Sequence, residues 1–136
     1  MVEFPAKADP AIVEALCAAA KNVSVPCVSG LTMSADDFYE GQARVDGFYC
    51  DYTYILDKFA FIKRMKDMGI KNIEMEALRL LSFCQRSGIK AGTVCAAILN
   101  RENGDNVTAT GAQIAQWVEN SWILIFEYIR ECEKKN

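Results

Sequence analysis

The stretch Ile70-Lys71-Asn72-Ile73-Glu74-Met75 lies between two segments of helical character. A helix is predicted over residues 56–68, where Gly69 stops it, and another over residues 76–87, where Gly88 stops it. The stretch between them is a short strand candidate. Because helices and strands alternate here, the sequence favours an α/β layered fold with a largely parallel sheet.

The same alternation extends to both ends of the chain. Asp9-Pro10 predicts a helix start, with Asp as N-cap and Pro in the first turn. Residues 23–32 are interpreted as a strand, and the apolar run Val94–Leu99 predicts a strand buried on both faces. A last helix is predicted over residues 110–134. Three strands would leave two unpaired edges, which indicates a partial domain.

The last predicted helix has an apolar side at helical spacing, which predicts a face turned toward the core. Its inner stripe is expected to be Ile114, Val118, Ser121, Ile125, Ile129 and Cys132, widened by Trp117, Trp122, Phe126 and Tyr128.

Composition excludes several function classes. The chain has 136 residues, of which 51% are hydrophobic and 24% charged, with a net charge of −3. Its Lys and Arg residues are scattered, which argues against a nucleic-acid partner. No apolar run reaches the ~20 residues of a membrane span. The start, Met1-Val2-Glu3-Phe4-Pro5, has no secretory signal pattern. A cytoplasmic protein without membrane or nucleic-acid partners is therefore expected.

Cysteine and histidine usage limits the chemistry further. The six cysteines form no CxxC pair, and the chain has no histidine. A Cys₂His₂ zinc site and Ser-His or Cys-His catalysis are thereby excluded, and no metal site is predicted. Cys84 and Cys95 stand in apolar surroundings, so both are expected in the core.

Gln42 and Arg44 form the first candidate pair. In an extended segment, side chains two residues apart point to one side. Gln can accept from a ring N–H and donate to a carbonyl, and Arg can donate to a second carbonyl. Such a pair suits the edge of a flat imide such as uracil. The spacing is equally compatible with a solvated loop pair.

Glu74 and Glu76 form the second candidate pair, at the end of the predicted strand. Carboxylates there can accept hydrogen bonds from vicinal sugar hydroxyls. Two alternatives remain open. One is a glycosidase pair of acid and nucleophile, and the other is surface charge that favours a helix start.

Four motifs, taken in order, resemble the uridine phosphorylases, and the animal-type enzymes more than the bacterial ones. They are Thr32-Met33 through Phe38-Tyr39-Glu40-Gly41-Gln42-Ala43-Arg44; Gly47 and Cys50; Asn72-Ile73-Glu74-Met75-Glu76; and Leu99-Asn100-Arg101 with Gly104-Asp105. The resemblance implies a three-layer α/β/α sandwich of nucleoside phosphorylase type. Residues 1–136 would form its C-terminal half, a partial domain with a mostly parallel sheet.

The resemblance also implies an activity and a site. The family converts uridine and phosphate reversibly to uracil and ribose 1-phosphate. The residues expected to bind uracil are Phe38, Gln42, Arg44, Ile98, Leu99 and Arg101, and those expected to hold the ribose are Glu74, Met75 and Glu76.

No cofactor is expected, and inorganic phosphate is the co-substrate. The family's phosphate-binding elements belong to the N-terminal half, so no phosphate site is predicted in this chain. A homo-oligomer, or a complementing N-terminal half, is the expected partner. The alternative is a catalytically inactive fragment or isoform that binds nucleoside weakly or acts through subunit association. A glycosidase-like hydrolase is a third hypothesis, for which no second acid is identified.

Overall fold

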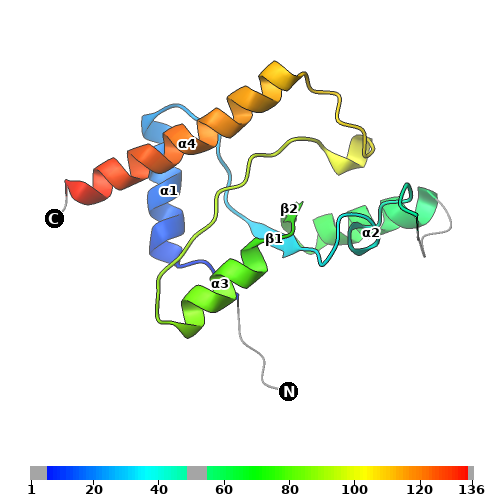
Figure 1. Ribbon diagram of the computed structural model, residues 1–136, viewed down its shortest axis with the longest axis horizontal. Coiled ribbons are helices and arrows are strands. Elements are labelled where there is room, and N and C mark those ends of the chain that lie inside the picture. Colours follow the sequence, from blue (N-terminus) through cyan, green and yellow to red (C-terminus); the bar gives the residue numbers. More distant parts are fainter. Residues whose placement is uncertain (1–5, 49–54, 135–136) are drawn as a thin grey trace. The chain divides into compact units, whose positions relative to one another are not determined.

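The computed structural model describes residues 6–48 and 55–134, which fall into two compact units. The first unit comprises the chain up to Ser29, residues 79–98 and the chain from Thr108 onward. The second comprises residues 30–78 and 99–107. Figure 1 shows the helices and strands of the chain, coloured along the sequence.

The first unit is built on two packed helices, α1 (Pro10–Asn22) and α4 (Gly111–Glu133). The Asp9 carboxylate accepts the N–H groups of Ala11 and Ile12, and a Thr110–Gln113 capping box starts α4. These local signals confirm the predicted starts of both helices.

Leu16, Ala20 and Leu124 form the buried cluster between α1 and α4. Leu124 is only 1% exposed. Around this cluster pack the half-buried residues Ile12, Val25, Val94, Ile125 and Tyr128. Burying apolar side chains of two helices in one cluster is the main stabilisation available to this unit.

Glu127 lies on the buried side of α4, where it forms an ion pair with Arg130 and accepts a hydrogen bond from Asn22. The Asn22 amide donates to Oε1 at 3.2 Å, and Arg130 Nη2 lies 2.6 Å from Oε2. The hydrogen bond from Arg130, together with that from Asn22, holds the pKa of Glu127 below its usual value despite burial. The carboxylate therefore joins the end of α1 to the middle of α4.

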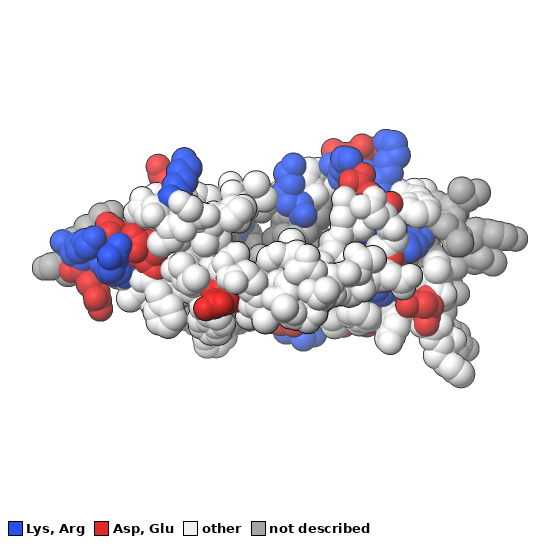
Figure 2. Space-filling view, turned by 90° about the horizontal axis from the view of Figure 1, so that it is seen from above, with Lys and Arg blue, Asp and Glu red and all other residues white. Residues whose placement is uncertain are grey.

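The predicted inner stripe of α4 is partly wrong. Val118, Trp122, Phe126 and Ile129 are exposed, whereas Leu124 and Glu127 are buried. Figure 2 views α4 with its charged side chains gathered toward the carboxyl end and an adjoining stretch with few charges. The hydrophobic residues of α4 extend over a broad side of the helix, but α1 covers only one part of that side.

The predicted strand over Val94–Leu99 is also wrong. Among the described residues, this segment pairs with no strand, and Cys95 and Ala97 are exposed. The preceding part runs close to α1: the Asp9 N–H donates to the Ala91 carbonyl at 2.8 Å, and a Cβ on Gly92 would lie 2.8 Å from Ile12 Cγ2. A strand needs at least one neighbouring strand to pair with its backbone groups, and neither β1 nor β2 pairs with this segment.

The second unit is a parallel β-α-β arrangement. β1 (Leu31–Ser34) pairs with β2 (Ile70–Glu74) in parallel, and α2 (Ile55–Asp67) connects them and packs on β2. A short 3-10 turn, η1 (Glu40–Gln42), follows β1. A parallel pair needs such a helical crossover, as the sequence predicts.

Two further elements follow β2. The helix α3 (Ala77–Arg86) starts directly after it and ends before Gly88, whose φ is +68°. The 3-10 turn η2 (Arg101–Asn103) packs on α2. β2 and α3 agree with their predicted positions within one or two residues.

The strand predicted over residues 23–32 is wrong except at its end. Only Leu31–Ser34 is a strand, because the preceding segment begins with a turn in which Ser24 has a φ of +56°. Cys84 is buried as predicted, but Cys95 is not. Cys50 lies outside the described residues.

Candidate functional site

Two segments with polar side chains leave the same edge of the β1–β2 pair. The strands are parallel, and Ser34 and Glu74 are paired at their carboxyl ends. The segment containing Phe38, Gln42 and Arg44 follows β1, and Met75 and Glu76 follow β2. The carboxyl edge of parallel strands is where open α/β sheets bind ligands.

Glu74 is held firmly at this edge. Its Oε2 accepts the N–H groups of Glu76 and Ala77, each at 2.6 Å, and Oε1 accepts the Ser34 hydroxyl. Burial raises the pKa of Glu74, but the hydrogen bonds from Ser34, Ala77 and Glu76 outweigh it and lower the pKa below its usual value. Both carboxylate oxygens thus serve to fix the start of α3 against β1.

Glu76 differs from Glu74 in its exposure. Its side chain is exposed, and Oε2 accepts the Met75 N–H at 3.0 Å. Met75 is half-buried beside it. Of the two glutamates, Glu76 is the more exposed, and Glu74 is half-buried.

The Phe38–Arg44 segment is a tight turn, not the extended segment on which the pairing of Gln42 with Arg44 was predicted. The Asp37 carboxylate accepts the N–H groups of Tyr39 at 2.7 Å and Gly41 at 2.8 Å. Ala43 is fully buried with a φ of +54°, and the Arg44 N–H donates to the Tyr39 carbonyl at 2.8 Å. A non-glycine residue in the left-handed region is uncommon and is held here by the surrounding hydrogen bonds.

The turn nevertheless buries both predicted polar side chains. Gln42 is 6% exposed and Arg44 is 7% exposed. The Gln42 amide nitrogen donates to the Asp37 carbonyl at 3.3 Å. The Arg44 guanidinium lies 4.1 Å from the centroid of the Phe38 ring, a cation–π contact. Since Phe38 is 48% exposed, the turn combines a solvent-accessible aromatic ring with two buried hydrogen-bonding groups.

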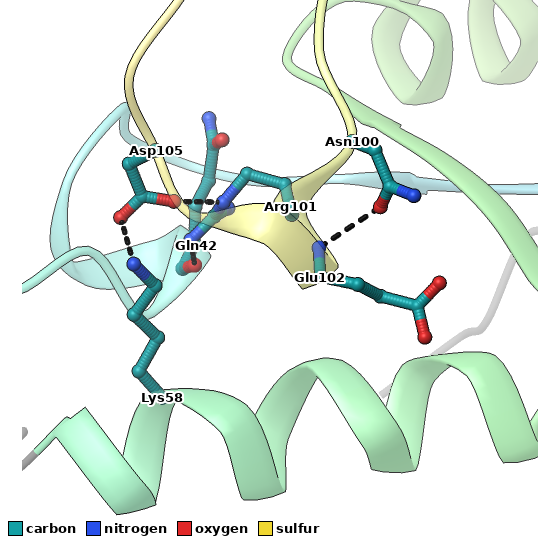
Figure 3. Close-up of polar contacts among 6 residues, drawn as sticks. All are labelled: Gln42, Lys58, Asn100, Arg101, Glu102 and Asp105. Carbon is teal, nitrogen blue, oxygen red and sulfur yellow. Dashed lines mark hydrogen bonds and ion pairs between the residues drawn. The ribbon is translucent and has the colours of Figure 1, made fainter.

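Arg101 is linked directly to this turn. Its Nη2 donates to the Gln42 backbone carbonyl at 2.9 Å, and its Nε donates to Asp105 Oδ1 (Figure 3). Lys58 Nζ lies 2.7 Å from the other oxygen, Asp105 Oδ2. The Nη1 atom of Arg101 is buried and has no acceptor among the residues that the structure describes.

Asp105 is shared by these two cations, with one carboxylate oxygen toward each. Burial raises the pKa of Asp105, but the hydrogen bond from Lys58 and the charge of Arg101 outweigh it and lower the pKa. Asp105 is therefore ionised at neutral pH, and the three side chains together carry one net positive charge.

The predicted site residues do not all belong to one unit. Phe38, Gln42, Arg44, Glu74, Met75, Glu76, Leu99 and Arg101 are in the second unit, and Ile98 is in the first. Leu99 is half-buried. No cluster of three metal-ligating side chains occurs within residues 6–48 and 55–134. No helix in the same ranges is long and apolar enough to cross a membrane.

Residues 2–130 match the Phosphorylase superfamily over almost the whole chain. The chain belongs to this superfamily. It is 43% identical over 130 residues to "Uridine and thymidine phosphorylase" of Caenorhabditis elegans, covering 96% of this chain and 44% of that relative. It is 33% identical over 126 residues to "Inactive uridine phosphorylase B" of Schistosoma mansoni, covering 91% of this chain and 42% of the relative.

A solved structure agrees with these relatives. The uridine phosphorylase of Schistosoma mansoni in complex with uracil matches with a TM-score of 0.89 and 31% identity, over 98% of this chain and 46% of that one. The predicted fold class, a nucleoside phosphorylase α/β/α domain present in part, is confirmed. The chain thus spans less than half the length of the relatives that it matches.

Sequence reasoning missed two residues that contact Arg101 of the candidate site, directly or through an ion pair: Asp105 and Lys58. Lys58 stands four residues before the buried Ile62 on α2 and is itself 6% exposed. A lysine on the same helical face as a core residue was the available signal, because lysine is rarely buried unless it is paired. Asp105 was noted only as part of a motif.

Proposed function

We propose that this chain supplies the uracil and ribose pocket of a uridine phosphorylase-like pentosyltransferase of pyrimidine salvage. The observation that carries this proposal is the buried Gln42–Arg44 turn beside the exposed Phe38 ring, at the carboxyl edge of a parallel sheet. Its relatives bear the name uridine phosphorylase, which supports the same reaction class for the whole protein.

The uracil ring would bind against the turn. Phe38 offers a flat apolar face to the base. The Gln42 amide can accept from the ring N–H and donate its second hydrogen to one carbonyl, while Arg44 donates to the other. Leu99 would contact the base as an apolar wall, and Arg101 would support the turn through its hydrogen bond to the Gln42 carbonyl.

The same groups would assist the chemistry. In phosphorolysis a phosphate oxygen forms a bond to the anomeric carbon, and the carbon–nitrogen bond to uracil breaks with its electron pair moving into the base. Buried donors aimed at this growing negative charge stabilise the transition state more than the substrate. Arg44 and the net positive charge of the Lys58–Asp105–Arg101 group suit that task.

The ribose would bind at the end of β2. Glu76 is exposed and can accept hydrogen bonds from the sugar hydroxyls, and Met75 can cover the sugar ring. Glu74 would contribute indirectly, because its carboxylate holds the start of α3 in place. No cofactor is proposed.

Phosphate would be held by a second polypeptide segment. Binding phosphate requires cations and backbone N–H groups, which the resemblance assigns to an N-terminal half. That half, or a second subunit in a homo-oligomer, is the proposed partner, and the cytoplasm is the proposed location.

An inactive binding protein is the second candidate function. The observation that favours it is the 33% identity to a relative named inactive uridine phosphorylase B. Such a protein would keep a nucleoside pocket and act through association with other subunits.

Uracil binding to the purified chain tests the proposal. In ligand-observed NMR, uracil should bind the wild-type chain. Its affinity for Gln42→Ala should be lower by at least about tenfold, because this variant loses a buried hydrogen-bonding side chain. Gln85→Ala, at an exposed position of α3, is the matched control and should bind as the wild type does. A folded wild-type chain that does not bind uracil would contradict the proposed pocket.

Phosphorolysis distinguishes the two candidate functions. The chain alone should release no uracil from uridine, with or without phosphate. After addition of the N-terminal half of a full-length relative, phosphate-dependent uracil release supports the enzyme. Uracil binding without turnover in that mixture supports the inactive protein. Thymidine should be tested beside uridine, because one relative is named for both substrates.

A further inference from the structure

We infer that Lys58 and Asp105 are positioning residues that preset the uracil-binding turn through Arg101. The inference rests on the proposed function for its ligand, but its structural part stands on the contacts alone. Those contacts form one continuous chain, from α2 through Lys58, Asp105 and Arg101 to the backbone of Gln42 (Figure 3).

Burial is the first argument for this role. The Lys58 and Asp105 side chains are 8% and 9% exposed, and their charged atoms lie 2.7 Å apart. Replacing a buried ion pair with apolar residues is often neutral or stabilising, so such a pair is weak evidence for a purely stabilising role. What the pair specifies is geometry, because each oxygen of Asp105 is committed to a different cation.

The fixed geometry of Arg101 is the second argument. Arginine presents its donors in a planar fork, so binding Nε to Asp105 fixes the direction of the other donors. One of those donors, Nη2, reaches the carbonyl of Gln42 at 2.9 Å. In Figure 3 the Gln42 side chain extends away from Lys58, so Arg101 contacts the backbone of Gln42 and not its side-chain amide.

The turn itself requires such support. It contains Ala43 in the left-handed region, and it closes through the N–H groups of Ala43 and Arg44, which donate to Glu40 and Tyr39 at 2.9 and 2.8 Å. Backbone in a sparsely populated region persists only where its surroundings hold it. Arg101 supplies one such contact from outside the turn.

A second ion pair, between α2 and the neighbouring turn η2, gives a matched control. Lys66 on α2 lies 2.7 Å from Glu102 on η2, but both side chains are exposed, at 66% and 48%. This pair joins α2 to η2, whereas Asp105 lies two residues beyond the end of η2. Neither Lys66 nor Glu102 forms a side-chain ion pair or hydrogen bond with Asp105 or Arg101. The control therefore separates positioning of Arg101 from mere attachment of η2 to α2.

The test compares Lys58→Met with Lys66→Met by amide hydrogen exchange and uracil binding. In Lys58→Met, exchange at Ala43 and Arg44 should accelerate about tenfold or more and uracil should bind at least about tenfold more weakly, as expected for losing a charge-assisted contact. Lys66→Met should resemble the wild type. Lys58→Arg, which keeps the charge, should recover most of both properties.

Each outcome decides the inference. It is overturned if Lys58→Met leaves both the turn and uracil binding unchanged, or if exchange rises equally throughout both units. If exchange at Ala43 and Arg44 rises but the wild type binds no uracil, the positioning role stands and the proposed function fails. Asp105→Asn breaks the same chain of contacts at the partner of Lys58, and it must give the same result if Lys58→Met does not fold.

Discussion

The Glu74 carboxylate accepts the backbone N–H of Ala77 at 2.6 Å, so the last residue of β2 also holds the first residue of α3. The same carboxylate accepts the Ser34 hydroxyl from the end of β1. Three elements therefore meet at one side chain. Glu76, two residues later, is exposed. The two carboxylates predicted from sequence as a pair have different surroundings, and this difference can be measured.

Glu74→Ala should destabilise the chain, and Glu76→Ala should not. Removing the carboxylate that caps α3 leaves N–H groups without an acceptor and should cost about 1–2 kcal/mol in the free energy of unfolding. Urea unfolding measures this, with amide exchange at Ala77 as the local readout. The effects on ribose 1-phosphate binding should be the opposite: Glu76→Ala should bind this ligand more weakly than Glu74→Ala does. Equal effects of the two substitutions on stability would contradict the assignment.

Arg44→Ala should impair the completed enzyme through the base. Losing a charged hydrogen bond of ~1.5–3 kcal/mol should lower kcat/KM for uridine about tenfold to a hundredfold or more. The measurement is steady-state phosphorolysis by the chain joined to the N-terminal half of a relative. Lys63→Ala, at an exposed position of α2, is the control and should be silent. Unchanged kinetics in Arg44→Ala would place this side chain outside the pocket.

The helices were predictable because their signals are local. Asp9 with Pro10, and Thr110 with Gln113, satisfy the first N–H groups of their own helices. The segment Val94–Leu99 was not predictable in this way. Its apolar run allows a buried strand, but a strand exists only where another strand pairs with it, and that information is not contained in the run itself.

The candidate site was predicted in its residues but not in its backbone. Gln42 and Arg44 are both buried, although Gln42 ends a 3-10 turn and Ala43, between them, is in the left-handed region. Nothing in an alanine signals that conformation, since it depends on contacts from Asp37 and Arg101. Lys58 escaped notice because a single lysine on a helix usually faces solvent.

Acid should destabilise the chain. Glu74, Asp105 and Glu127 have pKa values below their usual ones in the folded chain. Their contribution to stability is therefore fully present above the unfolded-state pKa of about 4, and it is lost as the pH falls through the lower folded-state values. The free energy of unfolding should decrease between about pH 5 and pH 2, and Asp105→Asn should reduce the slope. A free energy of unfolding that does not change over this pH range would contradict the lowered pKa values of these three carboxyl groups.

Leu124→Ala should destabilise the first unit strongly. Leu124 is 1% exposed and lies in the cluster with Leu16 and Ala20. Truncating a buried leucine costs about 2–5 kcal/mol because it leaves a cavity. Ile123→Ala is the matched control, because Ile123 is the neighbour of Leu124 on α4 and is itself 39% exposed. Urea unfolding, followed by the helical signal that includes α4, measures the free energy of unfolding of both variants. A similar loss of stability in the two would contradict the burial of Leu124 described above.

Finally, the chain by itself should associate rather than remain a stable monomer. Trp122 and Phe126 on α4 are 57% and 66% exposed, and Ile129 follows on the same side of the helix. Leaving a few hundred Å² of apolar surface in water costs several kcal/mol at about 25 cal/mol per Å², which is large beside a typical net stability of ~5–15 kcal/mol. Sedimentation should show oligomers or aggregates.

A double substitution tests whether this face of α4 causes the association. Trp122→Ser with Phe126→Ser should raise the monomer fraction, because the exposed apolar area becomes smaller and more polar. Gln116→Ser, at another exposed position of α4, should leave the distribution of the wild type unchanged. A wild-type chain that sediments as one monomer and unfolds in a single sharp transition would mean that its 136 residues form a complete domain, and the partial-domain interpretation would then have to be abandoned.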